Sequence, residues 1–144
     1  MRNLMIVLLL LAYQPAWAIT EKEVRDAVRQ AGGPQKLLVA MAKNMSSRAP
    51  LTLDTETTLL SAVAFDLDMN IDHQLININK KSDWAVFIKE QVKIESYQRN
   101  KLCSGDVWKV LLNQYGARGN YRYYARNGEL LFSFTVEKKH CQKR

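Results

Sequence analysis

The sequence contains few of the residues from which active sites are usually built. Its 144 residues include only two histidines and two cysteines. The glycine patterns of nucleotide-binding loops, the Gly-x-Ser-x-Gly turn of hydrolases and the His-Glu-x-x-His pair of zinc proteases do not occur. A nucleophilic Ser, Thr or Cys needs an oriented base, and neither His73 nor His140 lies in a motif that supplies one. We therefore expect no catalytic residues and no enzymatic activity.

Possible metal ligands are also few and poorly spaced. Cys103 and Cys141 are far apart in the chain, and His140 beside Cys141 does not form a zinc-binding spacing. The aspartates between positions 66 and 72 lack the ordered spacing of a calcium-binding loop. The sequence predicts no bound metal and no cofactor.

Long apolar runs are missing after the first dozen residues. The run at positions 4–12 is far shorter than the roughly 20 residues that a membrane-spanning helix needs. It follows Arg2 and precedes Ala16-Trp17-Ala18, which gives the charged start, apolar centre and small-residue cleavage signal of a secretory leader. We predict a cleavable signal peptide at residues 1–18; an uncleaved N-terminal anchor is the alternative.

The predicted mature chain, residues 19–144, has the length of a single domain and no transmembrane segment. Because Arg2 is the only charged residue of the leader, the formal net charge falls from +7 to +6 on cleavage. Such a surplus suits lipopolysaccharide, a membrane surface, nucleic acid or an acidic protein, and it also keeps a domain soluble. No cysteine lies near the cleavage point, so we expect a periplasmic or secreted protein without a lipid anchor.

The two cysteines of the mature chain predict one disulfide, Cys103 to Cys141. Thiols are oxidised in exported proteins, and an even number of cysteines favours pairing. A closed loop of about 39 residues would stabilise the fold by roughly 4 kcal/mol.

Two helices are predicted at the start of the mature chain. Thr20 and Glu23 form a capping box, and the helix that they open runs to Gln30 before Gly32-Gly33 ends it. A second helix starts at Pro34. Its apolar residues have helical spacing and predict one face packed on a sheet: Leu37, Leu38, Met41, Ala42 and Met45.

Strand patterns follow in the middle and at the end of the chain. Apolar and polar residues alternate over 57–67 and again over 71–79, which predicts two strands joined by a turn at 68–70. The dipeptide Asn127-Gly128 between two alternating runs predicts a C-terminal hairpin with a two-residue type I′ turn.

Two more helices are predicted between these strands. Apolar spacing over 82–103, with Ser82 as the N-cap, indicates a long helix, and Asp106 begins a shorter one that Gly116 ends. The predicted fold class is α+β: a single domain of helices packed on a small antiparallel sheet, with a C-terminal hairpin and one disulfide.

Residues 118–126 interleave aromatic and basic side chains. Three tyrosines lie at 121–124 with Arg118, Arg122 and Arg126 around them, a pattern that single-strand nucleic-acid binders present on a sheet. Alternating tyrosines are also ordinary cross-strand partners in a core. In an exported protein we favour the structural interpretation and do not expect nucleic acid as a partner.

A set of positions towards the C-terminus forms a layout found in small exported domains. These positions are Tyr97-Gln98-Arg99, Cys103, Leu111-Leu112, Gly116, Tyr121-x-Tyr123, Gly128, Val136 and Cys141, preceded by a helix to Asn44 and by Ala49-Pro50-Leu51. Over roughly residues 36 to 141, the chain resembles the beta-class pilotins of type II secretion and the quorum-sensing-regulated virulence factors of Gram-negative bacteria.

The resemblance implies a domain that binds a short C-terminal helix of a secretin and carries it to the outer membrane on a lipid anchor. Without the lipidated cysteine, we expect the binding role alone: a non-enzymatic, periplasmic protein-binding or assembly factor of a secretion, pilus or conjugation apparatus. Its partner would be a secretin or another apparatus component. The alternative is an inhibitor or immunity protein that binds an exported enzyme. The predicted contacts, on the long helix and the hairpin, are Lys93, Arg99, Arg122 and Tyr124.

Overall fold

A computed structural model describes residues 19–142 of the chain. The predicted leader, 1–18, lies outside these described residues. The helices are α2 (Glu21–Ala31), α3 (Pro34–Ser46), the 3-10 helix η1 (Lys81–Phe87), α4 (Ile88–Ser104), α5 (Asp106–Tyr115) and α6 (Lys138–Cys141). The strands are β1 (Leu51–Thr52), β2 (Thr57–Phe65), β3 (Asp68–Leu75), β4 (Arg118–Tyr124) and β5 (Leu130–Val136).

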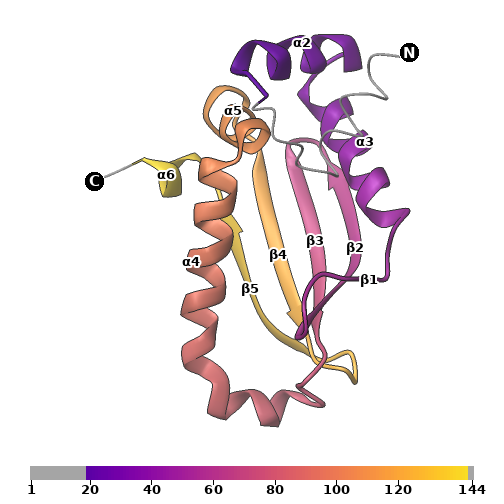
Figure 1. Ribbon diagram of the computed structural model, residues 1–144, viewed down its shortest axis with the longest axis vertical. Helices are drawn as coiled ribbons and strands as arrows, with labels where there is room; N and C mark the ends of the chain where they lie inside the picture. Colours follow the sequence, from indigo (N-terminus) through magenta and orange to yellow (C-terminus); the bar gives the residue numbers. More distant parts are fainter. Residues whose placement is uncertain (1–18, 143–144) are drawn as a thin grey trace.

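The five strands form one sheet in the order β1-β2-β3-β4-β5. Figure 1 shows α4 along the β5 side of the sheet and α3 along the β2 side, with α2 and α5 at one end. The α+β class predicted from the sequence is confirmed. Within the described part of the chain, none of the helices has the length and apolar character to cross a membrane.

The sheet is mixed, whereas the sequence predicted an antiparallel one. β3 and β4 pair in parallel, and the other neighbouring strands pair antiparallel. The chain between β3 and β4 passes through η1, α4 and α5. A connection of this length carries the chain back to the end of the sheet where β3 began, so that β4 can run parallel to β3. A short hairpin can join only antiparallel strands.

The two faces of the sheet differ in burial. In β3 the buried residues alternate with half-buried ones, and β4 follows the same pattern. The buried side faces the helices, and we call it the helix-side face; the other is the open face. The buried residues of β3 on the helix-side face are Met69, Ile71, His73 and Leu75.

The first two predicted helices, over residues 20–46, are confirmed. Thr20 Oγ1 accepts a hydrogen bond from the Glu23 amide, and Glu23 Oε2 accepts one from the Thr20 amide. Gly32 ends α2 with φ +85°, in the left-handed region that favours glycine. The predicted apolar face of α3 packs against β2, with Leu37, Leu38, Met41 and Ala42 buried and Met45 half-buried.

The turn between β2 and β3 lies earlier than predicted. β3 begins at Asp68, so the turn falls on Asp66 and Leu67 and not on residues 68–70. Asp66 has φ +56°, a conformation that aspartate tolerates better than most residues. The Leu67 carbonyl accepts a hydrogen bond from the Arg118 amide at 2.8 Å, so a tertiary contact fixes this turn.

The C-terminal hairpin is present, but its turn differs from the predicted type I′ turn. A type I′ turn needs positive φ at both central residues, and here Gly128 has φ +87° while Asn127 does not have a positive φ. The Gly128 amide donates to Ala125 O, and the Ala125 amide donates to Glu129 O. This is a three-residue turn, with positive φ at its last position. The Asn127 amide donates to Asn79 O at 3.1 Å, a contact that sequence analysis could not anticipate.

The predicted long helix is divided into two segments. Residues 81–87 form η1, and α4 begins only at Ile88. Ser82 does not cap the helix; instead the Lys80 amide donates to Asp83 Oδ2. Trp84 is buried, with its ring 5.0 Å from that of Phe132, whereas Ile88 is 60% exposed. The helical pattern was therefore correct, but its apolar residues do not all face the core.

Candidate partner-binding surface

An aromatic row crosses the helix-side face of the sheet. We define it as His73 of β3, Tyr123 of β4, Phe132 of β5 and Trp84 of η1. Strand pairing places His73 beside Tyr123, and Tyr123 beside Phe132. Successive ring centroids are 4.8, 4.8 and 5.0 Å apart, which is the range of favourable aromatic pairs. The row therefore ties three strands and η1 together.

The titratable groups of this face stay uncharged near neutral pH. Burial, followed by the nearby charge of Lys101, lowers the pKa of His73 to about 4. Burial raises the pKa of Tyr123 to about 12 and raises that of Tyr121 further. The imidazole of His73 packs by stacking on the rings of Tyr121 and Tyr123, with centroid distances of 5.8 and 4.8 Å. Among residues 19–142, His, Cys, Asp and Glu form no group of three that could hold a metal ion.

Several polar groups lie between the sheet and the η1 and α4 segment. Tyr123 Oη accepts a hydrogen bond from Gln98 Nε2 at 3.0 Å. Within the described residues, three buried atoms lack a hydrogen-bond partner: His73 Nδ1, Trp84 Nε1 and Arg99 Nε. A buried donor or acceptor without a partner costs about 1 to 3 kcal/mol. The unpaired buried side-chain nitrogens of the described residues thus belong to β3, η1 and α4, and none belongs to α3.

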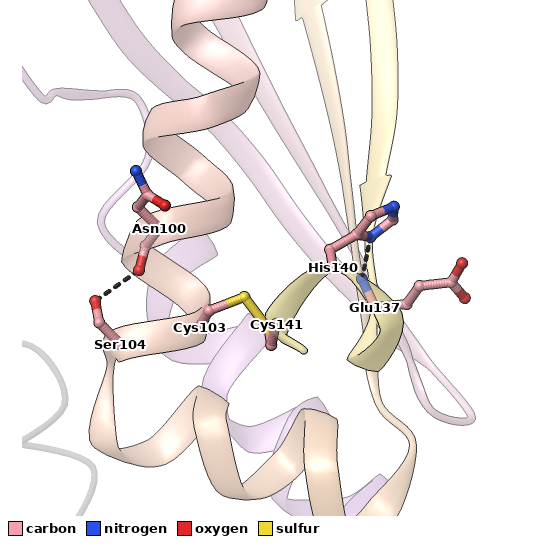
Figure 2. The surroundings of a disulfide bond; sticks show 6 residues. All are labelled: Asn100, Cys103, Ser104, Glu137, His140 and Cys141. Atoms are coloured by element: carbon pink, nitrogen blue, oxygen red, sulfur yellow. Dashed lines mark hydrogen bonds between the residues drawn. A yellow bond between two sulfur atoms is a disulfide. The ribbon is translucent and has the colours of Figure 1, made fainter. Parts of the chain in front are cut away.

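The C-terminal end of α4 is held firmly in place. Figure 2 shows the disulfide that links Cys103, near this end, to Cys141 of α6, with the Cα atoms 5.1 Å apart. This confirms the predicted pair. Leu102 lies directly over Gly119 of β4, because a Cβ built on that glycine would come within 2.8 Å of Leu102 Cδ2. Only a residue without a side chain allows this close approach.

Two of the predicted contacts lie on α4. Lys93 Nζ is 2.7 Å from Glu90 Oε1, and Arg99 Nη2 is 3.3 Å from Glu95 Oε2. Both are ion pairs between neighbouring turns of the helix, and such pairs contribute little to stability. Tyr97 is 62% exposed on the same helix. α4 therefore presents cationic and apolar side chains to solvent.

The other two predicted contacts belong to the open face. Arg122 alternates with Tyr123 along β4, so its side chain leaves the sheet on the side away from Gln98 and α4. Its guanidinium donates two hydrogen bonds to Asp72, at 2.6 and 2.9 Å. Tyr124 pairs with Gln74 in the parallel ladder and is half-buried. The four predicted residues thus do not form one surface.

The open face carries a polar network that sequence analysis missed. Arg118 Nη2 donates to Asp68 Oδ2 at 2.5 Å, and Asn120 Nδ2 donates to Asn70 Oδ1 at 3.1 Å. With Asp72 and Arg122, three alternate residues of β3 thus bond their partners of β4. The alternation of polar residues in both strands was visible in the sequence, but the parallel pairing that joins them was not.

The similarity of this chain to known proteins lies in its fold. No protein-family model and no curated protein sequence matches the chain. Three solved structures share its fold. The pilotin EpsS of the Vibrio vulnificus type 2 secretion system has 15% sequence identity and a TM-score of 0.63, over 83% of this chain and 99% of that chain.

The other two structures are a second pilotin and a protein of Pseudomonas aeruginosa. AspS, a type II secretion system pilotin of Vibrio cholerae, is 17% identical with a TM-score of 0.54, over 81% of this chain and 97% of that chain. A Pseudomonas aeruginosa protein regarded as secreted is 14% identical with a TM-score of 0.63, over 76% of this chain and 93% of that chain. The chain therefore has the fold of the type II secretion pilotins, as its sequence layout predicted.

Proposed function

We propose that this protein is a non-enzymatic, protein-binding assembly factor of a Gram-negative envelope apparatus, located in the periplasm or secreted. The observation that supports this most is the pilotin fold, which extends over nearly the whole length of EpsS. The proposed partner is a secretin or another component of a secretion, pilus or conjugation apparatus.

The exposed side of α4 is the proposed contact surface. On this side the ring of Tyr97, which is 62% exposed, lies near cationic side chains. Lys101 Nζ is 5.9 Å from the centre of that ring. Lys93 lies one helical turn before Tyr97, and Arg99 lies beside Gln98, which contacts the sheet. An amphipathic segment with acidic residues would match this combination of apolar and positive groups. The close attachment of α4 at Leu102 and Cys103 keeps the surface in a fixed position.

Arg122 and Tyr124 are proposed as a second, separate contact region. Arg122 already donates two hydrogen bonds to Asp72. A partner would therefore contact the Arg122–Asp72 ion pair and would not meet an unpaired cation. We therefore assign α4 the larger share of partner binding and the open face the smaller.

Site-specific photo-crosslinking in intact cells tests this proposal. A photoreactive amino acid is placed at Tyr97 on α4, at Tyr124 on the open face, or at Phe65 as a control. Phe65 is 79% exposed at the end of β2 and so offers an equally accessible aromatic position away from α4. Captured proteins are identified by mass spectrometry.

We expect one envelope apparatus component to be captured from position 97 and much less from position 65. Capture at 124 of the same component would add the open face to the interface. Equal labelling from all three positions, or no specific adduct from 97, would contradict the proposed surface. A soluble exported enzyme as the captured protein would replace the assembly role with that of an inhibitor.

A further inference from the structure

One end of the molecule exposes consecutive apolar side chains. We call this group the apolar tip and define it as Val86, Phe87, Ile88 and Val92, which are 82%, 46%, 60% and 67% exposed. They lie where η1 meets α4, at the end of the long axis opposite α2 and α5 (Figure 1). Apolar side chains that gather on a surface in this way mark an interaction site.

The apolar tip projects from a rigid support. Trp84, three residues before Phe87 in the sequence, packs on Phe132 with ring centroids 5.0 Å apart and is 7% exposed. This contact joins η1 to β5, so the exposed side chains beyond it stand on an anchored segment. Three of the four side chains come from successive positions, 86–88, and Val92 follows one helical turn after Ile88. A docked helix needs a hydrophobic groove, whereas a bilayer surface needs exposed apolar side chains next to cations.

Cations surround the apolar tip. Lys80 and Lys81 precede it at the start of η1, and Lys89 lies within it on α4. Across the described residues, none of these three lysines has a carboxylate within ion-pairing distance. The Asn127 amide donates to Asn79 O, which brings the hairpin turn and its cationic neighbour Arg126 to the same region.

The carboxylates of this region are already engaged. Glu90 pairs with Lys93 at 2.7 Å. Asp83 accepts a hydrogen bond from the Lys80 amide, and Glu129 accepts one from the Lys81 amide. The acidic groups therefore hold the local fold together. Besides a hydrogen bond from Asn127, the charges of Lys81 and Lys80 help to lower the pKa of Glu129. Neither these two amino groups nor that of Lys89, however, forms an ion pair among the described residues.

We propose that the apolar tip inserts into the surface of a bilayer that contains anionic phospholipid. The four apolar side chains enter the boundary between headgroups and acyl chains, and Lys80, Lys81 and Lys89 contact lipid phosphates. Apolar burial and attraction to anionic lipid together are what surface-binding helices use. This inference goes beyond the proposed function, because it concerns a lipid surface and a different end of the molecule from the Tyr97 contact.

Sedimentation of the purified protein with lipid vesicles tests the inference without any partner protein. Vesicles of phosphatidylcholine alone are compared with vesicles that also contain phosphatidylglycerol, at low and high salt. The apolar variant is F87S/I88S, and its matched control is V63S/F65S, which removes two side chains that are 59% and 79% exposed on β2. The charge variant is K80Q/K81Q/K89Q, with K22Q/K36Q/K43Q on α2 and α3 as its control. Near-UV circular dichroism verifies that each variant is folded.

We expect binding to the phosphatidylglycerol vesicles that weakens at high salt. F87S/I88S should lower the partition coefficient at least tenfold, and each lysine of the charge variant should contribute about fivefold. Both control variants should stay within about twofold of the unsubstituted protein, because their side chains lie away from the tip. Absence of binding at low salt, binding that ignores phosphatidylglycerol, or an equal loss in the controls would overturn the inference. Specific protein capture by a photoreactive residue at Val86, without vesicle binding, would assign the tip to a protein contact.

Discussion

At the residue scale, His73 is the most unusual side chain of the domain. It is 3% exposed, it stacks against Tyr121 and Tyr123, and its Nδ1 has no hydrogen-bond partner among the described residues. Such a group is stable in the core only while it is uncharged. Its protonation should therefore be linked to the stability of the whole fold.

The sign of this linkage follows from the depressed pKa of His73. The pKa falls from 6.5 to about 4 on folding, so the unfolded chain binds a proton more readily between these values. The contribution of His73 is fully present above pH 6.5 and is lost as the pH falls towards 4. Between about pH 7.5 and about pH 4.5 this amounts to a loss of roughly 2 to 3 kcal/mol in the free energy of unfolding.

H73F should remove that pH-dependent component, because phenylalanine stacks in the same place but does not titrate. Urea denaturation of both proteins across this pH range measures the difference. H140Q is the control: burial also lowers the pKa of His140, but that side chain is only half-buried whereas His73 is 3% exposed, so most of the pH dependence should remain. A pH dependence that H73F leaves unchanged would show that His73 is not its source.

Gly119 provides a second prediction at this scale. A Cβ at this position would lie 2.8 Å from Leu102 Cδ2 and 3.4 Å from Tyr121 Cε2. We expect G119A to reduce the free energy of unfolding by about 1 to 3 kcal/mol through overpacking. In an L102A background the same substitution should be neutral or stabilising, because the clash is gone and glycine is unfavourable within a strand. A double-mutant cycle by chemical denaturation gives the coupling, and additive effects would contradict the proposed contact.

At the scale of elements, the C-terminal hairpin shows how tertiary contacts select a turn. Its two strands lie in the predicted place, but the Asn127 and Arg126 amides donate to Asn79 and Ile78 carbonyls of the segment after β3. These bonds favour a turn in which Gly128 alone has positive φ. The turn thus serves as a contact between the hairpin and the start of the crossover connection.

Substitution of Gly128 tests this account of the turn. Gly128 has φ +87°, and a Cβ added there meets no atom within 4 Å. G128A should therefore cost about 1 to 2 kcal/mol from backbone conformation alone. G128N should cost less, because asparagine tolerates positive φ. The midpoints of thermal or urea unfolding measure both. Equal costs for Ala and Asn would show that the side chain meets a steric obstacle instead.

At the scale of the whole molecule, one covalent bond closes the C-terminal half of the domain. Cys103 and Cys141 are separated by 38 positions, and the loop that they close contains α5, β4, β5 and α6. The bond fixes the end of the crossover helix to the chain that follows β5. It therefore restricts the position of the end of α4 relative to β5.

The double substitution C103S/C141S should lower the free energy of unfolding by about 4 kcal/mol, as expected for a closed loop of this length. C103S and C141S alone should have the same effect as the pair, since either one removes the bond. Urea denaturation with and without a reductant supplies the measurement. A reductant that leaves the unsubstituted protein at full stability would contradict a stabilising role for the bond.

Sequence signals were sufficient to predict the helices that are fixed by interactions between residues close together in the chain. The capping box at Thr20, the stop at Gly32, the apolar face of α3 and the helix that ends at Gly116 follow from interactions within a few residues. The disulfide also followed from the sequence, because the chain has only two cysteines. The pilotin-like layout of cysteines, glycines and tyrosines predicted the fold that the comparison with solved structures found.

Only the tertiary structure decided which segments meet. The alternation of apolar and polar residues shows which side chains of a strand face the core, but it does not show which strand lies beside it. The parallel pairing of β3 with β4 could therefore not be predicted from the sequence. That pairing builds the aromatic row on one face and joins Arg122 to Asp72 on the other. It also separates Arg122 and Tyr124 from Lys93 and Arg99, which the sequence had grouped. Local propensity and side-chain period thus determined the elements, whereas contacts between residues distant in the sequence determined the surfaces.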